Sequence, residues 1–492
     1  MALLTIGKSQ SIISGNQKVT KFARQVETLY IKLKPQGERK YKMNYDVIVV
    51  GGGISGVMAA ITAARNGART LVMEQYGFLG GMLTAAGVGP MMTFHVEDRQ
   101  VVKGTTGELI ERMMKKGKSP GHVFDSIGYT YTVTPFDAEA MKHELELMLL
   151  ESGAVVLYHT MLSDVKVKEG VITGITVTNK AGISEMNAKV FIDATGDGDL
   201  SAWSGVEFTK GRLSDGAAQP MTMNMKMNNV DTEAIKDYVK ENPDEFPYLK
   251  GKTWMVDKAS KLSISGFART AEKGLKDKSL RFDNEGLLFF ETNNPGEVII
   301  NTTRIRGLDA TNPWDLTRAE IEGRRQVRNL EQFFREHVRG FENAVLLGSG
   351  PAIGVRGSRQ IKGIYTLTLE DLNSSKKFPD VIAHAGYPID VHSPDGKEVI
   401  REEDNIAWGS MYSVPYRCLV NHRITNLVTV GRCISATFEA QGAIRTTPIA
   451  GAIGQAGGAG AYLASKFGQK ASEVDISKVQ EILMSEGAYL IL

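Results

Sequence analysis

The sequence is poor in cysteine, in long apolar runs and in charge of one sign. It has two cysteines, Cys418 and Cys433, in 492 residues, too few for a disulfide framework, an iron–sulfur cluster or a CxxC redox pair. No apolar stretch approaches the roughly 18 residues that a membrane-spanning helix needs, and the first residues lack the apolar core of a secretory signal. These absences predict a protein of a reducing, cytoplasmic setting with no membrane span.

Charge is distributed unevenly along the chain. Residues 1–43 hold nine Lys and Arg against two Glu, whereas the whole chain has a net charge of only +2. The rest of the chain therefore carries a net −5, and a mildly acidic body lacks the basic face that nucleic-acid binding requires. We expect no nucleic-acid partner. The eight histidines show no metal-ligand spacing, so we expect no metal site.

Residues 1–43 are predicted to form a basic N-terminal extension. One interpretation is an arm that docks on a partner or a surface. The other, which we favour, is that the segment lies outside the functional protein, because MNYDVIVVGGG is a natural start for the domain that follows.

Glycine is the one residue in excess, at 52 of 492 positions against an average near 7%. The first cluster follows YDVIVV, a β-branched run typical of a buried parallel strand. Gly51, Gly53 and Gly56 match the G-x-G-x-x-G fingerprint of dinucleotide-binding folds, and a small-residue helix follows as far as Gly67. A second strand ends at Glu74, 21 positions after Gly53, where the fingerprint places an acid that accepts from ribose hydroxyls.

Each part of this unit has a physical role. Gly51 permits the tight turn, Gly53 lets the backbone approach a pyrophosphate, and Gly56 lets the helix pack on the strand. The helix that begins at Ile54 and Ser55 offers unpaired N–H groups and a positive dipole end to the phosphate. The unit predicts a bound dinucleotide but does not by itself separate FAD from NAD.

Three later glycine-rich segments favour FAD. The loop GFLGGMLTAAGVG follows the acid directly and offers a path for a flavin ribityl chain. KVFIDATGDGDL is typical of a strand that ends in a glycine turn, and the C-terminal part predicts a strand, a glycine, a loop and a small-residue helix from about Pro448 to Lys466. GSGPAIG, at residues 348–354, looks like a second nucleotide turn, but a β-like stretch follows it instead of a helix. We therefore expect no nicotinamide domain.

Four segments carry a family resemblance: ATGDGD (194–199), PYRCL (415–419), GRCISAT (431–437) and GQAGG (454–458). With the fingerprint, they resemble the bacterial FAD-dependent oxidoreductases of the large glutathione-reductase-like flavoprotein group, which are distantly similar to fumarate reductase flavoproteins. The resemblance implies an α/β fold with a Rossmann-like FAD-binding domain, a parallel sheet in a three-layer β-β-α arrangement, and an inserted α+β substrate domain. The implied limits are 44–210 and 401–470 for the two parts of the FAD-binding domain, 211–400 for the inserted domain and 471–492 for a C-terminal tail.

The fingerprint and the resemblance together assign the cofactor contacts. Leu162 is implied to hold the adenine through its backbone, Asp197 and Gly431 to lie near the ribityl–pyrophosphate path, and the helix after Pro448 to present its N-terminus to the flavin ring. The residues directly after Gly81 offer no His or Cys for covalent attachment, so we expect non-covalent FAD. The full predicted set is Gly51, Gly53, Ile54, Ser55, Gly56, Glu74, Gln75, Gly80, Gly81, Met82, Thr84, Leu162, Ala194, Thr195, Gly196, Asp197, Gly431, Arg432, Pro448, Gly454 and Gln455.

The resemblance implies an enzyme that transfers a hydride between a small-molecule substrate carbon and flavin N5. We expect a dehydrogenase or oxidase of an alcohol, an amine or a hydroxy acid. Two alternatives stay open: fumarate-reductase-like reduction of an activated double bond, and an FAD-binding subunit of a larger complex without turnover of its own. Oxygen, a quinone, a diffusible carrier or an acceptor protein would take the electrons, and a homo-oligomer is also open. Phe438 stands where the family commonly has a histidine, so that residue's chemistry is not carried over.

Candidate catalytic residues lie near the expected flavin ring. His95 is the best candidate for a general base, and Arg445 precedes the closing helix. Arg304 and Arg356 belong to predicted strands of the inserted domain, where they would clamp a substrate carboxylate or stabilise reduced flavin. Tyr412 is a candidate donor to a substrate oxygen.

The inserted domain also gives local structural predictions. Alternation in NPGEVIINTTRIRG places Arg304 and Arg306 on one face of a strand. Thr317 and Glu320 are placed as the capping box of the helix that follows. The methionines that alternate over residues 219–229 predict one strand face that belongs to the core.

Overall fold

The computed structural model describes residues 45–283, 286–395 and 405–491. The basic extension lies outside the described residues, so the interpretations of it stay predictions. None of the helices in the described ranges is long and apolar enough to cross a membrane.

A five-stranded parallel sheet in the order β21-β11-β1-β2-β7 forms the centre of the dinucleotide-binding half. In that order its strands are Leu427–Thr429, Ala188–Asp193, Tyr45–Val50, Thr70–Met73 and Val155–Leu157. Its central strands are mostly buried, as expected for a parallel sheet that is covered on both faces. The sheet therefore joins segments from the two ends of the described chain.

The two faces of β1 belong to different cores. Val47 and Val49 lie in the core on the helix side of the sheet, whereas Ile48 and Val50 lie in the core on the side of an antiparallel sheet. That second sheet has the order β10-β9-β8, with strands Gly182–Met186, Val171–Asn179 and Met161–Lys168. Alternate residues of one strand thus serve two layers, and the predicted α/β class with its three-layer β-β-α arrangement is confirmed.

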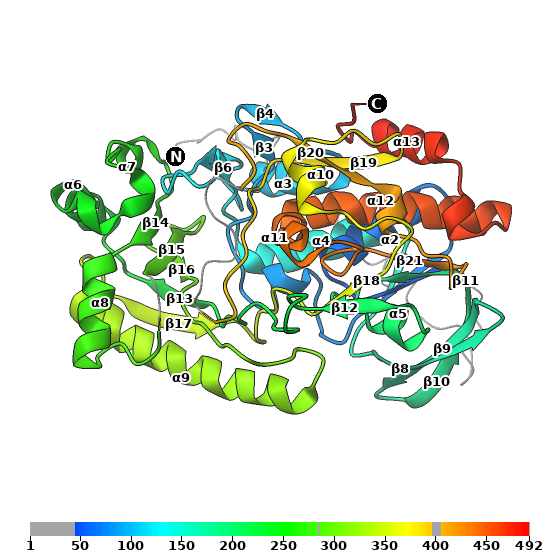
Figure 1. Cartoon of the computed structure of the whole chain (residues 1–492), viewed down its shortest axis with the longest axis horizontal. Helices are drawn as coiled ribbons and strands as arrows, with labels where there is room; N and C mark the ends of the chain where they lie inside the picture. The colour runs from blue at the N-terminus through cyan, green and yellow to red at the C-terminus, as the bar shows by residue number, and fades with distance from the viewer. Residues whose placement is uncertain (1–44, 284–285, 396–404, 492) are drawn as a thin grey trace, which may run out of the picture. The chain divides into compact units, whose positions relative to one another are not determined.

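Helices α2 and α12 lie side by side on the helix face of the sheet (Figure 1). A Cβ built on Gly454 would come within 2.1 Å of the Ser55 carbonyl oxygen, and one on Gly458 within 2.1 Å of the Ala59 carbonyl oxygen. Because both contacts advance by four residues, the helices run parallel with their backbones in contact. The helices of this layer are α2 (Ile54–Arg65), α3 (Gly104–Lys115), α4 (Ala138–Glu151), α12 (Thr447–Phe467) and α13 (Ile476–Ser485).

Glu486, directly after α13, ties α2 to α12. Its carboxylate accepts from Thr62 Oγ1 at 2.8 Å and from Asn66 Nδ2 at 2.9 Å, both at the end of α2. It also accepts from Gln455 Nε2 at 3.0 Å, while Gln455 Oε1 accepts from Thr105 N at 3.2 Å. The side chain of Gln455, which we predicted as a cofactor contact, is therefore committed to contacts between helices.

The inserted unit contains a separate antiparallel sheet of five strands, in the order β14-β15-β16-β13-β17. Its strands are Ser263–Gly266, Leu287–Glu291, Val298–Ile300, Met225–Asn228 and Val345–Ser349. Met221, Met223, Met225 and Met227 are all buried in the core of this unit, as predicted, although the regular strand begins only at Met225. Helix α9 (Pro313–His337) packs on this core (Figure 1). Three further helices of the unit are α6 (Thr232–Glu241), α7 (Met255–Lys258) and α8 (Ala268–Asp277).

The remaining strands and helices are short. The paired strands are β3 (His95–Val96) with β4 (Arg99–Gln100), β5 (Val123–Phe124) with β6 (Thr132–Val133), β12 (Phe208–Lys210) with β18 (Arg359–Ile361), and β19 (Val381–Ala385) with β20 (Tyr412–Pro415). The short helices are α5 (Asp199–Trp203), α10 (Leu369–Asn373) and α11 (Phe438–Ile444). No helix follows GSGPAIG, the segment at 348–354 that looks like a second nucleotide-binding turn, as its β-like continuation predicted.

Two local predictions in the inserted unit were wrong. Helix α9 begins after Asn312, whose side chain accepts from Trp314 N at 2.9 Å, so Thr317 lies inside the helix and forms no capping box. The expected long strand is limited to β16, which places Arg304 and Arg306 in the loop after it. Asn312 and the proline that follows are the stronger start signal, because an N-cap residue followed by proline at the first helical position suits both residues.

Some residues that we predicted to belong to the inserted domain pack in the core of the dinucleotide-binding half. Leu367, Leu372, Ile382 and Ile389 pack in the same core as β1, although we predicted the inserted domain to run to residue 400. The predicted C-terminal tail likewise contains α13, whose Leu483 is part of that core. The dinucleotide-binding half therefore gathers more of the C-terminal sequence than the glycine motifs indicated.

The contact between α2 and α12 predicts that replacing a helical glycine by alanine lowers stability in α12, whereas the same change in another helix raises it. Gly458→Ala should lower the free energy of unfolding by about 1–3 kcal/mol, because the added methyl group meets the Ala59 carbonyl oxygen. Gly107→Ala, in α3, is the matched control: its new Cβ has no neighbour closer than 3.8 Å, so it should raise stability by up to about 1 kcal/mol. Denaturant unfolding of the full chain measures both, and equal responses would contradict the backbone contact.

Candidate active site

The carboxyl ends of four parallel strands meet at one edge of the central sheet. The register pairs Val50 with Met73 and with Asp193, and Asp193 with Thr429, so the segments that follow these strands lie side by side. These segments are the fingerprint turn, Glu74, residues 194–197 and residues 431–432. Open parallel sheets bind ligands outside this edge, at the point where the strand order reverses, which here is β1.

The three fingerprint glycines are required for different reasons. Gly51 has a φ of +108°, and a Cβ there would lie 2.4 Å from the Ala194 carbonyl oxygen. A Cβ on Gly56 would lie 2.0 Å from the Gly51 carbonyl oxygen. Gly53 is different: its φ is −66°, and the nearest atom to its Cβ would be the Cα of Gly81 at 3.8 Å. The fold itself needs Gly51 and Gly56, whereas Gly53 leaves space that the described residues do not fill.

Glu74 lies at the end of β2 with 7% of its surface exposed. Its Oε2 accepts from Gly52 N at 2.7 Å and its Oε1 from Tyr76 N at 2.9 Å. Burial raises the pKa of Glu74, and these backbone hydrogen bonds oppose the rise. The carboxylate is thus fixed against the fingerprint turn, where the predicted ribose contact needs it. Gln75, the next predicted contact, is exposed.

The loop after Glu74 lies directly on the fingerprint turn. Gly80 N donates to Gly52 O at 2.9 Å, and a Cβ on Gly81 would come within 2.8 Å of the Gly53 Cα. Gly80 and Gly81 both have positive φ, which lets the chain reverse over the turn. Thr84 donates its hydroxyl to a carbonyl of the same loop at 2.7 Å. The loop therefore lies where the predicted contacts of Gly80, Gly81, Met82 and Thr84 with the cofactor would require it, and those contacts stay predictions.

The turn after β11 is held by a buried acid. Asp193 Oδ1 accepts from the backbone N–H of Thr195 at 3.1 Å and from its hydroxyl at 2.8 Å. Asp193 Oδ2 accepts from Ser201 Oγ at 2.6 Å. Thr195, predicted as a cofactor contact, thus spends its side chain on shaping the turn that carries Gly196 and Asp197.

Arg432 lies across from that turn and brings positive charge to the sheet edge. Its Nη2 donates to Asp197 Oδ1 at 2.8 Å, and Asp197 Oδ1 also accepts from Ser358 Oγ at 2.5 Å. Arg432 Nε is buried and has no hydrogen-bond partner in the described ranges. A buried guanidinium N–H without a partner, beside the N-terminus of α2, suits a pyrophosphate oxygen. Gly431 lies next to Ser55, since its Cβ would be 3.1 Å from Ser55 Oγ.

The N-terminus of α12 extends further out than that of α2. Seven residues of α12 precede Gly454 and one residue of α2 precedes Ser55, so at 1.5 Å per residue the offset is about 9 Å. Thr446, the N-cap, makes no side-chain cap, and its buried hydroxyl has no partner among the described atoms. Pro448 stands in the first turn. The two helix N-termini thus lie at different depths, and Gly454, which we predicted as a cofactor contact, packs against the backbone of α2.

Leu162 lies on β8, opposite Val177. In the described ranges β8 pairs with β9 alone, so one side of its backbone is an open sheet edge. The predicted adenine contact needs such free backbone groups, and it stays a prediction.

A charged cluster lies beside the start of α12, and we define it as Arg356, Tyr387, Asp390, His392 and Arg445. Arg445 Nη2 donates to Asp390 Oδ2 at 2.9 Å and to Asp390 O at 2.9 Å. Asp390 Oδ2 also accepts from the Tyr387 hydroxyl at 3.2 Å, and Asp390 Oδ1 lies 3.3 Å from His392 Nε2. The cluster joins the segment after β19 to the end of α11.

Arg356 is the most buried cation of the cluster, with 8% of its surface exposed. Its Nη1 donates to Pro220 O at 2.7 Å and to the Thr222 hydroxyl. Its carbonyl oxygen accepts from Gln441 Nε2 of α11 at 2.8 Å. Its Nε and Nη2 donate to none of the described residues, so one edge of the guanidinium is uncommitted.

Backbone contacts place this cluster next to the loop that lies on the fingerprint turn. Thr222 N donates to Gly354 O at 2.9 Å, two residues before Arg356. A Cβ on Gly354 would lie 3.4 Å from the terminal methyl group of Met82. Ala352 N donates to Ala85 O at 2.9 Å. The cluster is therefore bounded by the loop that follows Glu74 on one side and by the start of α12 on the other.

Burial sets the protonation states in the cluster. Burial lowers the pKa of Arg356, and the positive charges of Arg304 and Arg445 act in the same direction. Burial and the charge of Arg356 lower the pKa of His392 to about 3. Burial alone would raise the pKa of Asp390, but His392 and Arg445 outweigh it and hold that pKa well below its usual range. At neutral pH the cluster therefore contains a neutral imidazole next to a carboxylate.

Tyr129 adds an aromatic wall to the cluster. Its ring packs edge-on against Tyr387, with 5.8 Å between the ring centroids. Burial raises the pKa of Tyr129 well above its ordinary value, and Asp390 adds to the rise. The hydroxyl is therefore a neutral donor at physiological pH.

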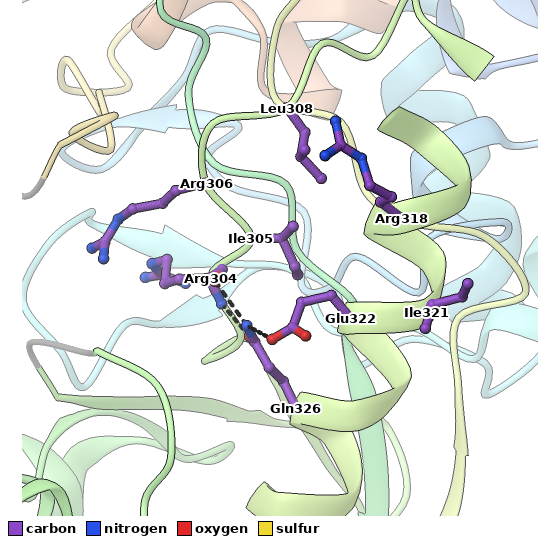
Figure 2. Close-up of a pocket in the computed structure, with 8 residues that line it drawn as sticks. All are labelled: Arg304, Ile305, Arg306, Leu308, Arg318, Ile321, Glu322 and Gln326. Carbon is purple, nitrogen blue, oxygen red and sulfur yellow. Dashed lines mark hydrogen bonds between the residues drawn. The ribbon is translucent and has the colours of Figure 1, made fainter. Parts of the chain in front are cut away.

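Arg304 lies on the outer side of the cluster, where it lines a cavity of about 490 Å³ against α9 (Figure 2). In Figure 2 the side chains of Arg304 and Arg306 point the same way, away from α9, while Arg318 projects from the helix. The cavity is lined by Arg304, Ile305, Arg306, Leu308, Arg318, Ile321, Glu322 and Gln326. The charge of Arg304 also acts on Arg356, whose pKa it helps to lower.

The other two predicted catalytic residues are committed elsewhere. His95 Nδ1 lies 3.0 Å from the Thr132 hydroxyl, and its ring packs edge-on against His122 at 4.9 Å, away from the contacts of the cluster. Tyr412 is fully buried, and its hydroxyl donates to Tyr387 O at 3.1 Å and to a carbonyl of α11 at 3.2 Å. Tyr412 therefore supports the site and has no free hydroxyl for a substrate.

Sequence reasoning missed Asp390, His392, Tyr387 and Tyr129. They occur in YPIDVH and SIGYTY, which contain no motif of the family resemblance. The one available signal was the spacing of Asp390 and His392, because alternate residues of an extended segment face the same side.

A family comparison agrees with this geometry: the chain matches the family described as FAD dependent oxidoreductase over residues 46–483. The chain belongs to that family. This FAD-dependent oxidoreductase is 30% identical over 274 residues to digeranylgeranylglycerophospholipid reductase 2 of Methanococcoides burtonii, a match that covers 53% of this chain and 62% of the relative. It is 29% identical over 166 residues to thiamine thiazole synthase of Methanococcus aeolicus, which covers 31% of this chain and 56% of that relative.

The chain thus spans about 60% of the length of these two relatives. Among solved structures, a geranylgeranyl bacteriochlorophyll reductase-like protein from Thermoplasma acidophilum matches with a TM-score of 0.46 and 14% identity, over 90% of this chain and 84% of that one. The oxidoreductase uses FAD, and the residues at the sheet edge fit it: Gly53 leaves space, and buried polar atoms of Arg432 and Thr446 lack partners.

The space at Gly53 predicts a variant that folds but does not hold FAD. Gly53→Val places its side chain where the pyrophosphate must approach, and the nearest described atom to its Cβ is 3.8 Å away. The purified variant should be colourless and should unfold at the same denaturant concentration as the FAD-free parent. Gly53→Ala is the graded control, with weaker FAD binding. Yellow Gly53→Val protein with a full complement of FAD would contradict the placement of the pyrophosphate.

Proposed function

We propose that this enzyme, as a member of the glutathione-reductase-like flavoproteins, oxidises a small alcohol, amine or hydroxy acid by hydride transfer to FAD. The neutral His392 beside Asp390 carries the proposal. His392 Nε2 faces the Asp390 carboxylate at 3.3 Å, and its Nδ1 has no hydrogen-bond partner in the described ranges. A carboxylate on one ring nitrogen favours the tautomer whose other nitrogen accepts a proton.

The residues of the cluster divide the work of the oxidation. Bound FAD supplies a two-electron acceptor. His392 Nδ1 accepts the proton of the substrate hydroxyl or amine, and the carbon–hydrogen bond loses its hydride as the C=O or C=N bond forms. Asp390 stabilises the imidazolium that results, in the way that a buried carboxylate orients and supports a histidine base.

Arg445 and the start of α12 set the charge around this base. Arg445 holds Asp390 in place through two hydrogen bonds. The N-terminus of α12 directs its dipole and the hydroxyl of Thr446 towards the same region, which favours negative charge there. Oxygen, a quinone, a diffusible carrier or a partner protein would then take the electrons, and the acceptor remains part of the proposal.

Reduction of an activated double bond is the second candidate. It is supported by the match to a protein named as a reductase, the digeranylgeranylglycerophospholipid reductase of Methanococcoides burtonii. The two directions separate in one anaerobic assay. Bleaching of oxidised flavin by an alcohol, amine or hydroxy acid supports oxidation, whereas re-oxidation of reduced flavin by an unsaturated compound supports reduction. A flavin that responds to neither would favour a subunit without turnover of its own.

Two histidine variants test the base. His392→Gln should slow anaerobic flavin reduction by a bleaching substrate by about 100- to 10,000-fold, because the proton loses its acceptor. FAD content should stay unchanged, since His392 contacts none of the fingerprint segments. His95→Gln is the control, because the ring of His95 packs on His122 outside the cluster. The reverse ranking of the two variants would return the role of base to His95.

The lowered pKa of His392 predicts an unusual pH profile. With a pKa of about 3, His392 is already neutral above pH 4 in the free enzyme, whereas an ordinary histidine is protonated below about pH 6.5. The kcat/KM for an alcohol or hydroxy acid should therefore show no acid limb near pH 6.5, and it should fall only as the pH approaches about 4. Stopped-flow flavin reduction between pH 4.5 and 8 measures this, and a limb near 6.5 would show that His392 is not the base.

A further inference from the structure

The uncommitted edge of Arg356 is the feature of the cluster that the oxidation does not explain. Arg356 is more than nine-tenths buried, and only its Nη1 donates, to one carbonyl and one hydroxyl. The Nε and Nη2 groups form the planar edge that arginine uses for bidentate binding of a carboxylate. Neither group is among the buried polar atoms that lack a partner in the described ranges, so this edge keeps some exposure and is open to a ligand.

The charge of Arg356 is not balanced by a paired carboxylate in the described ranges, and an anion would balance it. Asp390, the acidic member of the cluster, is held by Arg445 at 2.9 Å and faces His392. Burial lowers the pKa of Arg356, because a charged guanidinium is poorly stabilised away from water. One added negative charge at the free edge would compensate it.

We infer that the substrate carries a carboxylate, which binds to the Nε and Nη2 edge of Arg356 and leaves the carbon to be oxidised beside His392. The inference rests on the proposed function and narrows it: the substrate is a hydroxy acid or an amino acid, and not a simple alcohol or amine. Tyr129 adds a neutral hydroxyl to the surroundings of the cluster, since its ring packs on Tyr387 and the hydroxyl has no partner among the described residues.

A carboxylate fits this edge better than a phosphate does. The edge offers two parallel N–H groups in one plane, which match the two oxygens of a carboxylate. A phosphate carries more charge and three oxygens that all seek donors. The cations near Arg356 are Arg304 and Arg445, and Arg445 is already paired with Asp390.

The first experiment uses non-reacting probes on the FAD-loaded enzyme. Propionate, propionamide and inorganic phosphate are titrated under anaerobic conditions, and the change in the flavin absorption band is followed. Propionate should bind saturably, and at least about 30-fold more tightly than propionamide, because the amide cannot accept two charge-assisted hydrogen bonds. Phosphate should bind more weakly than propionate. Equal affinities for propionate and propionamide would overturn the inference without any variant.

The second experiment assigns the binding to Arg356. Arg356→Met should weaken propionate binding by about 100-fold and Arg356→Lys by about tenfold, because lysine keeps the charge and loses the planar edge. Tyr129→Phe should weaken it by a few-fold. Arg328→Met is the control, since Arg328 is exposed on α9 and pairs with Glu331. FAD content is measured for every variant.

The outcomes separate this inference from the proposed function. If lactate or alanine bleaches the flavin and lactamide or alaninamide does so equally fast, the oxidation stands and the carboxylate site is overturned. If propionate binds in an Arg356-dependent manner but no hydroxy or amino acid bleaches the flavin, the anion site stands and the oxidation fails. If Arg356→Met shifts the flavin reduction potential and leaves propionate affinity unchanged, Arg356 serves the flavin and the inference is wrong.

Discussion

The parallel contact between α2 and α12 is the constraint on which the site depends. At Gly454 and Gly458 the two helices approach so closely that a methyl group would overlap the opposite backbone. This contact fixes the fingerprint turn at one helix N-terminus relative to Arg445 and Thr446 at the other. Since helices advance 1.5 Å per residue, a change of one residue in this register would move the N-terminus of α12 by about that distance relative to the fingerprint turn.

The charged cluster shows how the two halves share one site. Arg356 comes from the inserted side and donates to the backbone at Pro220, whereas Arg445 belongs to the helix that precedes α12. Asp390 and His392 come from the segment between β19 and β20. Burial of these groups together changes which of them hold protons, because neighbouring cations oppose a proton on His392. Neither half alone would place the neutral imidazole of His392 and the buried cation of Arg356 together.

The local patterns predicted the dinucleotide-binding fold, but they gave no sign of the charged cluster. The strand, the turn and the helix around Gly51, Gly53 and Gly56 follow from short-range sterics, so the sequence shows them directly. The Asp390–Arg445 pair joins residues 55 positions apart, and it depends on how β19 and α11 pack. The commitment of Tyr412 to backbone carbonyls is likewise a tertiary fact that a residue type cannot reveal. The prediction that Arg304 lies on a strand was wrong for the same reason: the chain leaves the sheet after Ile300, and the local sequence does not show this.

The sheet order also has a consequence for how the chain folds. Phe191 of β11 pairs with Leu427 of β21, more than 200 positions later, and β21 leads into the helix that packs on α2. Contacts so distant in sequence form late, since the loop between them must close before they add stability. During synthesis the inserted unit, whose core lies between Met221 and Val355, is complete before β21 has been made. The dinucleotide-binding half is therefore completed after the inserted unit of the same chain has been made. Until then, β11 has no neighbour on the side that β21 later occupies.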